Sequence, residues 1–129
     1  MSLRYKFYKP EIDDASYPLQ EWNDLTDIQQ LDIIVAESAK FTVLIFKHST
    51  RCIMSITLLW KFERKFDFEE SELKPYFLDL IAHRDISDEI AFRFGIKHES
   101  PQFILIRDGK VIGHASHEPI HDYDLREKL

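Results

Sequence analysis

The stretch Phe41–Phe46 is a continuous run of β-branched and aromatic residues. A run of this length, apolar on both faces, is typical of a central strand that protein covers on both sides. The next long segment, Cys52–Phe66, contains neither Gly nor Pro and repeats apolar residues at helical spacing. The sequence therefore predicts a buried strand that leads through a short turn into a helix.

The segments around this unit continue the alternation of helices and strands. Asp108-Gly109 is a strong signal for a hairpin turn between two antiparallel strands. This alternation implies a mixed sheet with helices on both faces. The other elements that we expect are a helix over Asp24–Ala39, a strand over Tyr76–His83, a helix from Ser87 to Phe94 that ends at Gly95, strands over Gln102–Arg107 and Lys110–Ala115, and a closing helix from Pro119.

The length of 129 residues predicts one domain, residues 1–129, in which residues 1–21 form a loosely organised lead-in. A formal net charge of −6 and the lack of any Lys/Arg run argue against binding to nucleic acid. The longest apolar run is far too short to cross a bilayer, so we expect no membrane segment.

Cys52 is the only cysteine, so no disulfide scaffold can form, and an intracellular protein is expected. In the first turn of a helix, unpaired backbone N–H groups and the helix dipole favour the thiolate form. Cationic side chains just upstream, at Lys47, His48 and Arg51, would favour it further. The competing interpretation is a buried, inert core cysteine.

Cys52 and Ser55 have the spacing of a Cys-x-x-Cys redox pair, with a hydroxyl in place of the second thiol. Ser55 cannot resolve a mixed disulfide. It can instead donate a hydrogen bond to the thiolate from one turn along the same helix face.

Other side chains give no sign of a bound group. His114, His117 and His121 are spaced by three and four residues, but no cysteine or positioned carboxylate accompanies them as a zinc site would need. The few glycines are too dispersed to hold a phosphate. We expect no metal and no tightly bound cofactor.

The strand Phe41–Phe46, the Cys-x-x-Ser turn at the start of a helix, and Ser100-Pro101 ahead of a hairpin together resemble the thioredoxin fold. The resemblance implies an α/β protein with a mixed central sheet of four or five strands and helices on both faces. It also implies a cis Ser100–Pro101 bond that lies against Cys52. Without the resemblance the trans form is expected, since only about 5–6% of such bonds in folded proteins are cis.

The string Lys47-His48-Ser49-Thr50-Arg51-Cys52 with Ser55, and the string His98-Glu99-Ser100-Pro101-Gln102, resemble the monothiol bacilliredoxin family over about residues 22–121. The resemblance implies a bacterial, cytoplasmic protein linked to bacillithiol, a small anionic thiol that replaces glutathione in some bacteria. Ile53 departs from the family, in which many members carry Pro after the cysteine.

The expected function is that of a monothiol thiol-disulfide oxidoreductase that removes bacillithiol, its co-substrate, from S-bacillithiolated client proteins as a monomer or weak dimer. Two alternatives stay open: a non-catalytic module that holds a partner in the groove at Pro101, and a redox sensor that dimerises through Cys52. The expected site comprises catalytic Cys52 and Ser55, and substrate-binding Lys47, His48, Thr50, Arg51, Ser100 and Pro101.

Overall fold

The computed structural model describes residues 22–117 and 119–129. The predicted lead-in, residues 1–21, lies outside the described residues. None of the helices in the described ranges is long and apolar enough to cross a membrane. In chain order the elements are β1 (Asn23–Asp24), α2 (Gln30–Glu37), β2 (Thr42–His48), α3 (Ile53–Lys65), β3 (Leu73–Asp79), α4 (Arg84–Phe94), β4 (Gln102–Arg107), β5 (Lys110–Ser116), α5 (Pro119–Asp122) and the 3-10 helix η1 (Leu125–Lys128).

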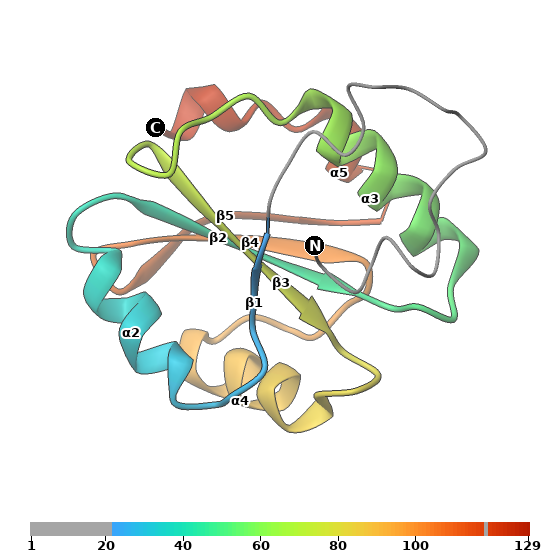
Figure 1. The fold of residues 1–129 in the computed structure, drawn as a ribbon, viewed down its shortest axis with the longest axis horizontal. Helices are drawn as coiled ribbons and strands as arrows, with labels where there is room; N and C mark the ends of the chain where they lie inside the picture. Colours follow the sequence, from blue (N-terminus) through green and yellow to red (C-terminus); the bar gives the residue numbers. More distant parts are fainter. Residues whose placement is uncertain (1–21, 118) are drawn as a thin grey trace.

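The strands form one sheet in the order β1-β3-β2-β4-β5. β3 is parallel to both β1 and β2, whereas β4 is antiparallel to β2 and β5. Figure 1 shows α2 and α4 on one face of the sheet and α3 with α5 on the other. The predicted mixed sheet of four to five strands with helices on both faces is thus confirmed.

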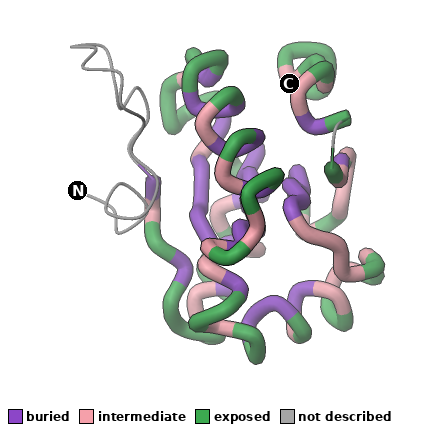
Figure 2. Tube along the Cα trace, turned by 90° about the vertical axis from the view of Figure 1, so that its right-hand side faces the viewer, coloured by how far each residue is buried: buried purple, intermediate pink, exposed green. Residues whose placement is uncertain are grey.

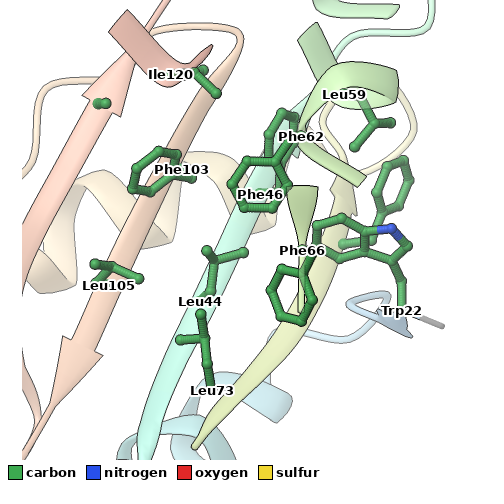
Figure 3. Close-up of a cluster of buried hydrophobic side chains, with 12 residues drawn as sticks. Trp22, Leu44, Phe46, Leu59, Phe62, Phe66, Leu73, Phe103, Leu105 and Ile120 are labelled. Atoms are coloured by element: carbon green, nitrogen blue, oxygen red, sulfur yellow. The ribbon is translucent and has the colours of Figure 1, made fainter. Parts of the chain in front are cut away.

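β2 lies at the centre of the sheet and is buried along its whole length. Figure 2 shows buried segments in the interior of the molecule and exposed segments mainly on its outside. Successive side chains of a strand point to opposite faces. Leu44 and Phe46 therefore join Trp22 in the aromatic core next to α3, which Figure 3 shows. Val43 and Ile45 join the mainly aliphatic core next to α2 and α4. A strand that is apolar on both faces is needed because each face has a core of its own.

The first helix is shorter than the predicted Asp24–Ala39. Asn23 and Asp24 pair with β3, and the backbone N–H of Leu25 donates to the carbonyl of Phe77 at 2.8 Å. Leu25 is 1% exposed. The prediction of a helix from Asp24 was wrong, because pairing with a distant strand decides the conformation of these residues and the helical spacing does not.

β3 begins and ends earlier than the predicted Tyr76–His83. Pro75, which precedes the predicted strand, lies inside β3. Its carbonyl accepts a hydrogen bond from the side chain of Asn23 at 2.9 Å, so its backbone faces the short edge strand β1. A missing N–H on that side costs no ladder hydrogen bond to β2, which is how a strand tolerates proline. The carboxylate of Asp79 then accepts hydrogen bonds from the backbone N–H groups of Ile81 and Ala82, so these residues form a turn and not the end of a strand.

The last third of the chain follows the prediction more closely. α4 begins three residues before Ser87 and ends at Gly95, which adopts the left-handed conformation with φ 65°. Asp108 and Gly109 both have positive φ and form the predicted hairpin turn. The single closing helix is divided instead into α5 and η1, and between them Tyr123 packs edge-on against Phe103 with 4.8 Å between ring centroids.

Candidate active site

Cys52 is the N-cap residue of α3, at the end of the loop that follows β2. Its backbone is extended, its N–H donates to the carbonyl of Ser49 at 3.2 Å, and its carbonyl accepts the first helical hydrogen bond from Ile56 at 3.0 Å. The residue is partly exposed. The structure therefore places a reachable thiol at the helix end where unpaired backbone N–H groups lie, and it excludes the alternative of a fully buried core cysteine.

Ser55 is fully buried one turn further along α3. Its hydroxyl oxygen accepts a hydrogen bond from the backbone N–H of Ser49 at 3.1 Å and lies 2.8 Å from Nδ1 of His48. His48 is buried as well and packs against the ring of Phe77. These contacts fix Ser55 against β2 and its loop, and its expected hydrogen bond to the thiolate stays a prediction.

Lys47 is fully buried on the opposite face of β2. Its ammonium group donates a hydrogen bond to the side-chain oxygen of Gln102 at 3.0 Å. The pKa of Lys47 is lowered from 10.5 to about 8, mainly by burial and in addition by the nearby charge of Arg84. Lys47 therefore faces the protein interior in this structure, where a substrate does not reach it.

Ser100 and Pro101 come directly before β4, and the bond between them is cis, as the resemblance implied. The carbonyl of Pro101 accepts a hydrogen bond from the backbone N–H of His117 at 3.0 Å. Lys47 is the register partner of Gln102, so the start of β4 lies beside the end of β2. The two halves of the predicted site, around Cys52 and around Pro101, thus emerge at the same end of neighbouring strands.

The remaining predicted residues lie in the loop before α3. Thr50 is partly exposed and Arg51 is exposed, so direct contact with a substrate is open to these two and closed to buried Lys47 and His48. Ile53 and Met54 add an apolar surface next to the cysteine, with 81% and 44% of their areas exposed.

Sequence reasoning missed a polar cluster at this end of the sheet, on the face that α4 covers. Ser87 is buried and its hydroxyl lies 3.1 Å from Nδ1 of His98. The pKa of His98 is lowered, mainly by burial and then by the nearby charges of Lys47 and Arg84. His98 and Gln102 were part of the string that carried the family resemblance, but no spacing in the sequence links them to Lys47.

A family model described as monothiol bacilliredoxin BrxC matches residues 23–125. Among solved structures, a candidate oxidoreductase with a thioredoxin fold is similar at 28% identity and TM-score 0.69, over 82% of this chain and 91% of that one. Thioredoxin from Trypanosoma brucei brucei is similar at 22% identity and TM-score 0.62, over 89% and 91%.

Thioredoxin from Malassezia sympodialis is similar at 16% identity and TM-score 0.63, over 82% of this chain and 87% of that one. At such identities the two thioredoxins establish the fold, and the family match adds the chemical class, a thiol oxidoreductase. With its cysteine at the start of α3, the chain belongs to the monothiol bacilliredoxin family.

Proposed function

We propose that the protein removes bacillithiol from client proteins that carry it as a mixed disulfide, and that Cys52 is the nucleophile. The observation that carries the proposal is the partly exposed Cys52 at the N-cap of α3, with a buried hydroxyl at the Ser55 position. A chain with one cysteine can exchange a mixed disulfide but cannot form an intramolecular one.

In the proposed exchange, the Cys52 thiolate attacks the bacillithiol sulfur of the mixed disulfide. The client thiolate leaves and takes a proton from solvent, and a disulfide between Cys52 and bacillithiol forms. A second low-molecular-weight thiol then attacks this disulfide, which regenerates Cys52 and produces a small disulfide. One disulfide is conserved in each step, so the cycle needs a reducing thiol and no other oxidant or reductant.

The end of the sheet at which β2 finishes and β4 begins supports docking of an extended client segment. The segment Ser100–Pro101 runs into β4 beside the end of β2, and backbone groups ahead of a strand can pair with a peptide. Exposed Arg51 offers a cation for the carboxylates of bacillithiol.

The proposed setting is the bacterial cytoplasm, where thiols are kept reduced. The test uses a client protein loaded with bacillithiol and intact-mass measurement of both proteins. We expect the wild type to release the client thiol and to gain one bacillithiol, whereas Cys52→Ser does neither. Equal release by the two proteins would overturn the proposal.

The same samples separate the alternatives. A stable client complex that forms equally well with Cys52→Ser, without exchange, would indicate a binding module. A covalent dimer of doubled mass after mild oxidation would indicate a redox sensor. Wild-type protein alkylated at Cys52 is the matched control, since it keeps every other side chain.

A further inference from the structure

A chain of hydrogen bonds, buried at Lys47 and partly buried beyond Gln102, connects Lys47 to the residues around the Ser100–Pro101 segment. The ammonium of Lys47 donates to Oε1 of Gln102 at 3.0 Å. The amide nitrogen of Gln102 in turn donates to the carbonyl of Lys97 at 3.1 Å and lies 3.3 Å from the hydroxyl of Ser116. One lysine on β2 is thereby connected to the loop before Pro101 and to the end of β5.

Burying the ammonium charge of Lys47 costs free energy. Lys47 is fully buried, and it takes part in none of the ion pairs that the structure shows among residues 22–117 and 119–129. An apolar side chain on this face would join the aliphatic core without the cost of burying a charge. A charge that is retained at such a position indicates that its hydrogen bond has a specific role.

The donor-only chemistry of lysine gives the hydrogen bond a direction. An ammonium group has three donors and no acceptor, so the carbonyl end of the Gln102 amide must face Lys47. The NH₂ end must then face the carbonyl of Lys97 and the hydroxyl of Ser116. The Lys97 carbonyl, which only accepts, requires the same orientation, so Lys47 and Lys97 hold the amide from its two ends. Without the ammonium, the oxygen end of the amide loses its partner and the side chain is held at one end only.

We propose that Lys47 is a positioning residue that acts through Gln102 to hold the Ser100–Pro101 segment at a fixed place relative to Cys52. Gln102 directly follows Pro101, and Lys47 lies five residues before Cys52 on the neighbouring strand. The segment that Lys47 holds is the one that docks the client, so this role rests on the proposed function. Removal of the ammonium should weaken client binding and leave the thiol itself intact.

The test compares three variants. Lys47→Met keeps the length of the side chain and removes the ammonium. Gln102→Glu keeps an acceptor for Lys47 but has no N–H for the Lys97 carbonyl, so it breaks the second half of the chain only. Lys110→Met is the matched control, since this exposed lysine lies at the hairpin on the far end of the same sheet.

Two measurements test the link from Lys47 to the Pro101 segment without the disulfide-exchange reaction. Hydrogen exchange of the His117 amide reports on the Pro101 carbonyl that accepts its hydrogen bond. The rate of Cys52 alkylation by iodoacetamide reports on the thiol alone. We expect Lys47→Met and Gln102→Glu to raise exchange at His117 about tenfold or more, with alkylation rates within about twofold of wild type.

The third readout is turnover of the bacillithiol-loaded client. We expect both variants to raise KM about tenfold with a smaller change in kcat, as for a lost binding surface, and Lys110→Met to match the wild type. Unchanged exchange at His117 in Lys47→Met would overturn the inference, and so would losses of turnover and of alkylation that run in parallel. A wild type that does not process the client overturns the proposed function instead, and the exchange experiment then decides the role of Lys47.

Discussion

The hydroxyl oxygen of Ser55 lies 2.8 Å from Nδ1 of His48, and the backbone N–H of Ser49 donates to the same oxygen. Ser55 occupies the position that a second thiol holds in a Cys-x-x-Cys pair. Because Ser55 and His48 are both fully buried, the hydroxyl is held between α3 and β2 and is no free surface group. Because Ser55 occupies the position of the resolving thiol, a substitution at Ser55 tests directly what the lack of that thiol does.

Ser55→Cys should convert the protein into one that resolves its own adduct. Residues three apart in the first turn of a helix are neighbours, so the new thiol can attack the disulfide between Cys52 and bacillithiol. Bacillithiol then leaves as a thiol and an intramolecular disulfide forms. We expect the lifetime of the adduct, followed by intact mass without added thiol, to fall about tenfold or more.

Ser55→Ala is the control for that experiment, because it removes the hydroxyl and adds no thiol. Its adduct should last as long as in the wild type. It should also lower the free energy of unfolding by about 1–2 kcal/mol, because the imidazole of His48 and the N–H of Ser49 each lose a buried contact. An adduct that lasts equally long in Ser55→Cys and Ser55→Ala would contradict the prediction.

Ile53→Pro should restore the residue that many relatives carry and should slow alkylation of Cys52 at neutral pH. Ile53 is the first residue of α3, where proline is well tolerated, and Cys52 has ψ 116°, which suits the residue before a proline. The substitution removes one unpaired backbone N–H at the helix end, a hydrogen-bond donor next to the reacting sulfur. We expect a change in stability of less than about 1 kcal/mol.

The measurement is the rate of Cys52 alkylation across pH 5 to 9 in the wild type, Ile53→Pro and Ile53→Ala. Ile53→Ala removes the exposed apolar side chain and keeps the N–H, so its alkylation should match the wild type. Equal slowing in both variants would assign the effect to the side chain and would contradict the role of the N–H.

Local patterns in the sequence predict the parts of the fold that local chemistry decides. The run Phe41–Phe46 identifies the central strand because each of its faces needs a core, and Asp108-Gly109 identifies the hairpin because both residues tolerate positive φ. Cys52 at the start of a helix follows from the same strand and the turn after it. These elements carry half of the candidate site.

Contacts between distant residues could not be predicted in this way. Lys47 and Gln102 are 55 residues apart, and a lysine is ordinarily assigned to the surface. Leu25 joins β3 against the helical spacing of its neighbours. Pro75 lies in a strand because β1 is short and at the edge. In each case a partner far along the chain decides the outcome.

Lys47 should make stability depend on pH in the alkaline range. Its pKa is about 8 in the folded protein, against 10.5 in an unfolded chain. Below pH 8 both states bind the proton. Between pH 8 and 10.5 only the unfolded chain binds it, so the folded state gains stability as pH rises, by about 3 kcal/mol at most.

The measurement is urea unfolding of the wild type and Lys47→Met at pH 7, 8, 9 and 10. The free energy of unfolding of the wild type minus that of Lys47→Met should rise with pH, because the variant lacks the titrating amine. The corresponding difference for Lys110→Met should stay flat. A flat difference for Lys47→Met would show that the buried ammonium keeps its ordinary affinity for the proton.

Gly113 on β5 should tolerate a methyl group only when Tyr123 loses its hydroxyl. A Cβ atom on Gly113 would clash with the Tyr123 hydroxyl oxygen and would lie 3.4 Å from the ring carbon that bears it. Gly113→Ala should therefore displace Tyr123 from Phe103 and cost about 1–3 kcal/mol of unfolding free energy. In a Tyr123→Phe background the same change should be neutral or stabilise by about 0.5–1 kcal/mol, because alanine suits a strand better than glycine.

A double-mutant cycle measured by urea unfolding checks this change of sign. The single substitutions and the double one give the coupling between the two positions, which should be at least about 1 kcal/mol in favour of the double variant. Equal costs of Gly113→Ala in the two backgrounds would mean that the Tyr123 hydroxyl does not set the limit. The closing segment of the chain would then be held on β5 by contacts other than the approach of Tyr123 to Gly113.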